Sequence, residues 1–104
     1  MRRGEVRWYR FHAPDKQRPV VILTRDSAID YLGDVTVAPV TSTVRDIPSE
    51  VVLGPADGMA HECAVNLDHV QTIARGRIGA LITTLSPRRL VEIRTALLFA
   101  LGYP

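Results

Sequence analysis

Three segments set the architecture of this chain: Arg18-Pro-Val-Val-Ile-Leu-Thr-Arg-Asp26, Val35-Thr-Val-Ala-Pro-Val-Thr-Ser-Thr43 and Glu50-Val-Val-Leu53. The first two are rich in branched apolar residues, a pattern typical of strands that are buried on both faces. Each also has polar chemistry at one end. Arg18 opens the first segment, and Thr41, Ser42 and Thr43 close the second. A cation and hydroxyl groups at the ends of rigid strands predict a functional site that the sheet holds in place.

The spacing of these segments predicts which residues face each other. We expect the first two segments to be antiparallel neighbours in which Thr24 pairs with Val35. The same register places Arg18 opposite Thr41. Directly opposed residues have Cβ atoms about 4.5–5.5 Å apart, so a guanidinium and a hydroxyl group are expected side by side. A slip of one residue would turn these side chains to the other face of the sheet.

The length and composition indicate one globular domain spanning residues 1–104. Apolar residues make up 46% of the chain, an ordinary share for a globular protein. No apolar run approaches the ~18 residues of a transmembrane helix. The charged start, Met1-Arg-Arg-Gly-Glu-Val6, lacks the apolar core of a signal peptide. We therefore expect a cytoplasmic protein.

The basic residues are mostly arginines, and many of them lie early in the chain. Lys16 is the one lysine among 13 basic residues, and the formal net charge is +2. Arginine binds phosphate through two hydrogen bonds at once and stacks on aromatic rings, although a GC-rich coding sequence would also favour it. Position is the stronger indication of nucleic-acid binding, since seven basic residues fall in the first quarter: Arg2, Arg3, Arg7, Arg10, Lys16, Arg18 and Arg25.

The cysteine and the histidines do not form a metal-binding pattern. Cys63 is the single cysteine, so an internal disulfide is impossible and a packing role is expected. His12, His61 and His69 share no ligand spacing. His61 and Cys63 are two residues apart and would face the same way on a strand, but two ligands make a weak metal signal. We predict no metal site and no cofactor.

The rest of the chain predicts further short strands followed by one helix. Pro39 indicates an edge position or a bulge in its strand, because proline cannot donate to a ladder. A helical turn is expected over residues 26–33, capped by Asp26 or Ser27, and turns over 12–17 and 54–58. The expected strands are residues 4–11, 18–24, 34–41, 50–53, 62–67, 70–73 and 78–81.

The C-terminal segment has the signals of an amphipathic helix. Ser86 suits the N-cap, Pro87 suits the first helical position, and Gly102 suits the stop. Apolar residues recur between them at helical spacing, namely Leu90, Ile93, Leu97, Leu98 and Leu101. The fold class is therefore mainly β with helices (α+β), a small and strongly curved barrel with a helix packed on it.

The order of these motifs resembles the MazF/PemK family of toxin endoribonucleases over residues 3–101. The short loop over residues 12–17 is most similar to that of mycobacterial MazF toxins. The matching blocks are Arg3-Gly-Glu-Val6, Arg18-Pro-Val-Val-Ile22, Val37-Ala-Pro-Val-Thr-Ser42, Glu50-Val-Val-Leu53 and Val65-Asn-Leu-Asp-His-Val-Gln-Thr-Ile73.

The resemblance implies an SH3-like barrel of the CcdB/PemK type that works as a homodimer. It implies cleavage of single-stranded RNA at short sequences without a metal, by attack of the 2′-hydroxyl, and inhibition by a cognate MazE-like antitoxin. The catalytic arginine and threonine of the family correspond to Arg18 and Thr41. Many members have a longer loop before the Arg-Pro pair, so cleavage specificity does not carry over.

These residue types suit RNA cleavage. Arg18 can hold phosphate oxygens through its planar fork, and Thr41 can hydrogen-bond the developing charge. The alternative for Thr41, Ser42 and Thr43 is that hydroxyl groups at a strand end only cap the backbone; if Ser42 is functional, it adds a hydrogen bond. His12 is either a general base or an exposed turn residue. Of the adjacent Trp8 and Tyr9, one is expected to stack on a base and the other to be in the core.

The further candidate RNA contacts are Lys16, Gln17, Arg25 and Arg45. Three remaining polar residues are expected to be incidental or structural, namely His61, His69 and Gln71.

Two other functions remain open at this stage. A CcdB-like toxin shares this fold and binds DNA gyrase without cutting RNA. That activity would rest on a Trp-Gly-Ile type of ending, whereas this chain ends Leu101-Gly-Tyr-Pro104. A non-catalytic RNA-binding barrel is the second alternative.

Overall fold

The computed structural model describes residues 1–10 and 17–104. Within them, seven strands and two α-helices follow one another, and three short 3₁₀ turns connect them, η1 (Pro55–Asp57), η2 (Leu67–His69) and η3 (Arg75–Arg77). The main elements are β1 (Glu5–Arg10), β2 (Gln17–Ile22), α1 (Asp26–Ile29), β3 (Asp34–Thr41), β4 (Glu50–Leu53), β5 (Cys63–Asn66), β6 (Gln71–Ala74), β7 (Ile78–Thr84) and α2 (Pro87–Leu101).

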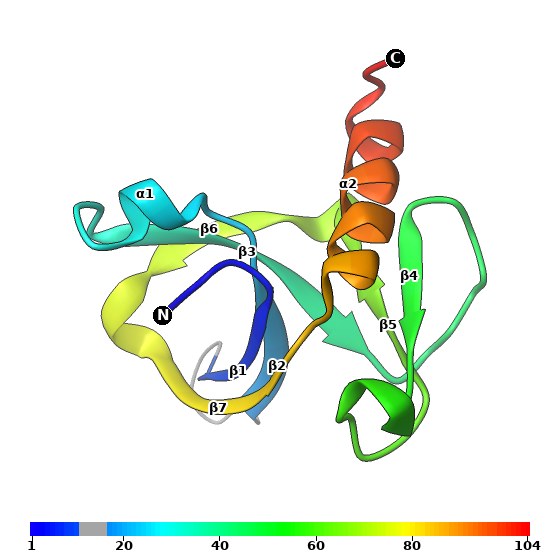
Figure 1. The fold of residues 1–104 in the computed structure, drawn as a ribbon, viewed down its shortest axis with the longest axis horizontal. Coiled ribbons are helices and arrows are strands. Elements are labelled where there is room, and N and C mark those ends of the chain that lie inside the picture. Colours follow the sequence, from blue (N-terminus) through cyan, green and yellow to red (C-terminus); the bar gives the residue numbers. More distant parts are fainter. Residues whose placement is uncertain (11–16) are drawn as a thin grey trace.

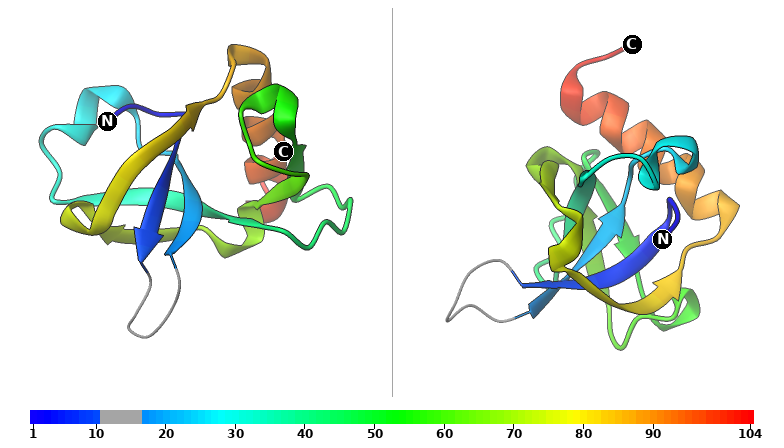
Figure 2. Two further views of the ribbon diagram at one scale, coloured as in Figure 1. Left: turned by 90° about the horizontal axis from the view of Figure 1, so that it is seen from below. Right: turned by 90° about the vertical axis from the view of Figure 1, so that its left-hand side faces the viewer.

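The strands form one antiparallel sheet in the order β4-β5-β3-β2-β1-β7, and β6 pairs with β3. Figures 1 and 2 show the sheet curling strongly, with α1 near one end and α2 beside β4 and β5 at the other. The prediction of a mainly β fold with a C-terminal helix is confirmed. No helix in the described part of the chain is long and apolar enough to cross a membrane.

The predicted register between the first two segments is confirmed. Val20 pairs with Pro39, and Ile22 pairs with Val37, which is the register that sets Arg18 opposite Thr41. The ladder itself ends at Val20, because β3 then leaves β2 and pairs with β5. Arg18 and Thr41 therefore lie just beyond the last paired residues, where two diverging strands open a space between them.

Of the two positions predicted for Pro39, an edge strand or a bulge, the edge position is wrong. β3 is interior, with β2 on one side and β6 or β5 on the other. Pro39 lies between Val37, the last residue paired with β6, and Val40, the first paired with β5. The missing N–H therefore falls where β3 changes partners, and no ladder hydrogen bond is lost there.

The core is divided between two clusters, and β2 contributes to both. Val21 belongs to the first, together with Ile93 of α2, and Val20 and Ile22 belong to the second. All three β2 side chains are fully buried, as the unbroken apolar run predicts. Because both faces of β2 are packed, its first residues are held in place relative to the rest of the sheet.

Helix ends follow the sequence signals at α2 but not at α1. Ser86 Oγ accepts a hydrogen bond from the Arg89 N–H at 3.2 Å, and Gly102 takes the left-handed conformation with φ 77°. At α1 the N-cap is Arg25, with no side-chain cap. Neither expected cap, Asp26 or Ser27, is the N-cap, and Asp26 instead accepts a hydrogen bond from the Arg3 N–H at 2.6 Å. A long-range bond replaces the local one.

Other boundaries differ by a few residues from those expected. α1 ends at Ile29, earlier than the predicted helical turn, and β7 continues to Thr84, beyond the predicted residue 81. Strand ends depend on whether a neighbouring strand continues beside them, and β7 has β1 beside it as far as Glu5. The predicted turn over residues 12–17 falls almost wholly outside the described residues.

A partly buried ion pair joins α2 to the loop after β4. Arg89 Nε donates to Asp57 Oδ1 at 2.8 Å, and Arg89 Nη1 donates to Glu92 Oε2 at 2.9 Å. Asp57 Oδ2 also accepts the Gly54 N–H at 3.0 Å. The hydrogen bond from Arg89 holds the pKa of the Asp57 carboxyl below its usual value. In the folded protein at neutral pH, Asp57 is therefore charged, and these hydrogen bonds fix its side chain.

We expect Asp57→Asn to lower the free energy of unfolding by about 1.5–3 kcal/mol at pH 7, the usual loss for a hydrogen bond to a charged group. Because the folded pKa is depressed, this stabilisation is complete above the unfolded pKa of about 3.9 and is lost as pH falls through the folded value. Urea unfolding at several pH values should show the native and variant proteins converging in acid. Asp30→Asn, at an exposed ion pair with Arg75, is the control and should cost less than ~1 kcal/mol.

Candidate active site

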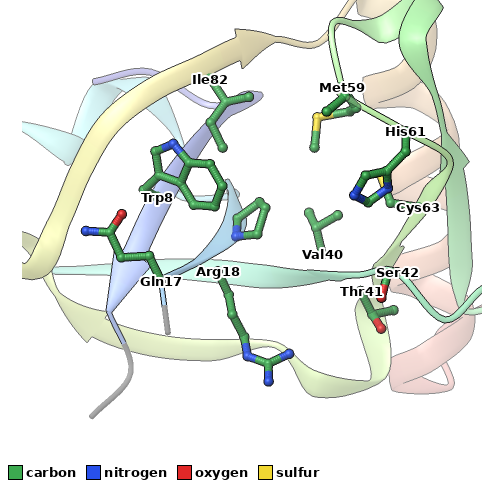
Figure 3. A pocket seen from close by; sticks show the side chains of 12 residues that line it. Trp8, Gln17, Arg18, Val40, Thr41, Ser42, Met59, His61, Cys63 and Ile82 are labelled. Atoms are coloured by element: carbon green, nitrogen blue, oxygen red, sulfur yellow. The ribbon is translucent and has the colours of Figure 1, made fainter. Parts of the chain in front are cut away.

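A cavity of about 540 Å³ opens where β2 and β3 diverge. Its size is in the range of pockets that bind small ligands or parts of polymers. Figure 3 shows the side chains that line it, which come from β1, β2, the end of β3, the loop before β5, β5 itself and β7. The residues that line it are Trp8, Gln17, Arg18, Pro19, Val40, Thr41, Ser42, Met59, Ala60, His61, Cys63 and Ile82.

Arg18 is an exposed cation at the second position of β2, paired with Tyr9 of β1. Among the described residues, no acidic side chain forms an ion pair with it. The two residues that follow it, Pro19 and Val20, belong to the ladder with β1, and Val20 is fully buried. The backbone that carries Arg18 is thus fixed, while its guanidinium remains available to an anion.

Thr41 is the last residue of β3 and pairs with Ala64 of β5. Its Oγ1 accepts a hydrogen bond from the Thr43 N–H at 3.1 Å, which is the backbone-capping role weighed against function above. Accepting that bond uses a lone pair and leaves the hydroxyl proton free to donate. Thr41 can therefore cap the strand and still donate to a phosphate oxygen. Ser42, the next residue, is exposed and lines the same cavity.

One wall of the cavity is apolar. Trp8 is 38% exposed and opens onto it, beside Pro19, Met59 and Ile82. Tyr9, the adjacent residue on β1, is only 5% exposed and belongs to the core. The expectation that one of the two aromatic side chains is buried and the other open is confirmed. An indole beside an exposed cation suits a nucleobase, which stacks on aromatic faces.

His61 and Cys63 lie on the wall next to the end of β3. His61 precedes β5, and its Nδ1 lies 3.0 Å from the carbonyl oxygen of Glu62. Cys63 is buried, and that burial raises the pKa of its thiol, so the sulfur is a neutral packing group. The described residues include no group of three or more histidine, cysteine or acidic side chains able to hold a metal ion.

His61 lines the cavity, although the sequence predicts an incidental residue there. The one signal that the sequence offers is its two-residue spacing from Cys63, which by itself indicates only a weak metal motif. His69 lies elsewhere, with its Nδ1 3.2 Å from Asn66 Nδ2.

Three other candidates lie outside the cavity. Arg25 follows β2 at the end opposite Arg18 and precedes α1. Arg45 lies in the connection between β3 and β4, where its N–H donates to Glu50 Oε1 at 3.0 Å. Gln71 opens β6 and pairs with Val37. The predicted roles of His12 and Lys16 concern residues outside the described ranges.

Comparison with known proteins agrees with this architecture. The family model described as PemK-like, MazF-like toxin of type II toxin–antitoxin system matches residues 2–101. The probable endoribonuclease MazF2 of Mycobacterium tuberculosis (strain H37Rv) is 41% identical over 93 residues, which is 88% of this chain and 89% of that protein.

Two solved structures extend the likeness to the fold. The Mycobacterium tuberculosis toxin MazF-mt6 superposes with a TM-score of 0.88 at 32% identity, covering 96% of this chain and 98% of the other. An endoribonuclease in complex with its cognate antitoxin, from a mycobacterial species, gives a TM-score of 0.89 at 29% identity, covering 100% and 97%. The resemblance to mycobacterial toxins noted from the sequence motifs is confirmed. The chain therefore belongs to the PemK-like, MazF-like toxin family of type II toxin–antitoxin systems.

Proposed function

We propose that this toxin is an endoribonuclease that cuts single-stranded RNA, messenger RNA above all, by attack of a 2′-hydroxyl on the adjacent phosphorus. Its relatives bear the name endoribonuclease. The observation that carries the proposal is that Arg18 and Thr41, at the ends of two neighbouring strands, line one open cavity. Translated messenger RNA would place this work in the cytoplasm.

The reaction passes through a phosphorane whose negative charge must be stabilised, and two groups of the cavity can do this. The guanidinium of Arg18 can bind both non-bridging oxygens, and the Thr41 hydroxyl can donate a third hydrogen bond. Fixed donors aimed at developing charge are commonly the largest contribution to catalysis. Trp8 would stack on a base next to the scissile phosphate, with Gln17 and Ser42 offering hydrogen bonds at the rim. No step of this scheme uses a metal ion.

The proposal includes two protein partners. A second copy of the chain would form a homodimer, as the family resemblance implies. A MazE-like antitoxin would inhibit the enzyme by laying an extended acidic segment over the same cavity, where Arg18 offers an unpaired cation among the described residues. The complex of an antitoxin with a relative of the same fold supports this partner.

Incubation of the purified protein with a long single-stranded RNA in excess EDTA tests the proposal. We expect cleavage at a short repeated sequence and products that end in a 2′,3′-cyclic phosphate and a 5′-hydroxyl, identified by mass spectrometry. RNA binding without cleavage would instead indicate the non-catalytic barrel. Inhibition of gyrase without cleavage would indicate a CcdB-like toxin. Cleavage that requires an added divalent cation would refute the metal-free scheme.

A further inference from the structure

The hydrogen bond that His61 makes determines which of its ring nitrogens carries the proton. Nδ1 lies 3.0 Å from the Glu62 carbonyl oxygen, and a carbonyl can only accept. Nδ1 must therefore be the protonated nitrogen, so in the neutral ring Nε2 carries a free lone pair. No hydrogen bond from the described residues reaches Nε2. Figure 3 shows the imidazole directed into the cavity.

Strand pairing places this ring near the end of β3. Thr41 pairs with Ala64, and His61 lies three residues before Ala64. His61 is in the loop that leads into β5, and three residues span at most about 10 Å of backbone. A phosphodiester held by Thr41 and Arg18 would therefore present its neighbouring ribose to the same wall.

His61 is also the one suitable base among the described residues that line the cavity. The charged and titratable groups around it are Arg18 across the cavity, Cys63 on the same wall, the adjacent Glu62, and Asp57, whose charge acts on Cys63. An arginine stays protonated, and the buried Cys63 stays a neutral thiol at neutral pH. Hydroxyl groups do not accept protons at this pH. Only an imidazole has its ordinary pKa near neutrality.

We propose that His61 is the general base of the cleavage reaction, accepting the 2′-hydroxyl proton at Nε2; this rests on the proposed function. As the proton moves to Nε2, the O2′–P bond forms and the P–O5′ bond breaks. The departing O5′ takes a proton from solvent water, and the resulting hydroxide is neutralised when the imidazolium returns its proton to solvent. The products are a 2′,3′-cyclic phosphate and a 5′-hydroxyl, and no water is consumed.

Single-turnover cleavage by His61→Ala and His61→Gln tests this role. General-base catalysis contributes about 10²–10⁴-fold to the rate. We therefore expect the single-turnover rate constant to fall by at least about 100-fold in both variants. The acidic limb that a general base gives to the native pH–rate profile should disappear with the imidazole. Added imidazole should restore part of the activity of His61→Ala. His69→Ala, which removes an exposed histidine outside the cavity, should behave as the native enzyme.

Binding of an uncleavable 2′-O-methyl RNA separates chemistry from affinity. We expect both His61 variants to bind it within about twofold of the native protein. A loss of affinity equal to the loss of rate would make His61 a binding residue and overturn the inference. So would activity within about threefold of native, or a retained acidic limb. If the native protein cleaves RNA and Arg18→Ala does not, these outcomes refute the role of His61 alone; if the native protein cleaves nothing, the proposed function itself fails.

Discussion

Arg18→Ala is expected to abolish RNA cleavage, lowering kcat by about 10³–10⁵-fold, the range found when an arginine that stabilises a phosphoryl transition state is removed. The side chain is exposed, and no described acidic residue pairs with it. Its removal therefore takes a cation from the cavity without opening the core. Single-turnover kinetics on a defined RNA measure the effect, and the melting temperature should change by less than about 3 °C.

Two further arginine variants make this result specific. Arg18→Lys keeps the charge but loses the planar fork, so it should recover only a small part of the rate. Arg88→Ala removes an exposed arginine from α2, away from the cavity, and should leave cleavage unchanged. Native-like activity of Arg18→Ala would contradict the proposed function. Unfolding of that variant at a much lower temperature would make Arg18 a structural residue instead.

Gly58→Ala is expected to be the most destabilising of the single substitutions considered. Gly58 has φ +90°, and a Cβ there would lie 2.8 Å from Thr83 Cβ and closer still to Thr83 Oγ1. Thr83 cannot turn away freely, because its hydroxyl donates to the Asp57 carbonyl at 2.9 Å. Backbone strain and overpacking together should cost about 2–4 kcal/mol, lowering the melting temperature by roughly 10–30 °C.

The same substitution should also disturb the cavity, because Met59, Ala60 and His61 follow Gly58 directly and line it. Gly33→Ala is the matched control, since nothing lies within 4 Å of a Cβ at that position and its φ is not positive. It should be neutral or slightly stabilising, by up to ~1 kcal/mol. Equal melting temperatures for the two variants, measured by calorimetry, would show that the contact with Thr83 is not restrictive.

Most elements of the fold follow from local patterns in the sequence. The β3 and β4 boundaries match those expected, and α2 begins and ends at its predicted cap residues. The register of β2 against β3 also follows from the sequence, because both strands are buried on both faces and a slip would misplace every side chain. For the same reason, Arg18 and Thr41 could be identified together before the structure was known.

Features that depend on distant partners could not be read in the same way. Asp26 is not a helix cap because Arg3, far away in the sequence, offers its N–H. Pro39 is not at an edge because β6 and β5 cover different parts of β3. In both cases, a contact between segments that are distant in the sequence outweighs the local preference of the residue.

The chain's own residue pattern was enough to specify the strands, the helix, and a cation and a hydroxyl group at the ends of neighbouring strands. The cavity around them required the folded molecule, because its walls come from β1, β2, β3, β5, β7 and the loop before β5. His61 lies 43 positions from Arg18 in the sequence, and no periodic pattern links positions so far apart. Its place beside the cavity follows from the antiparallel pairing of β3 with β5, a long-range contact that sequence spacing does not encode.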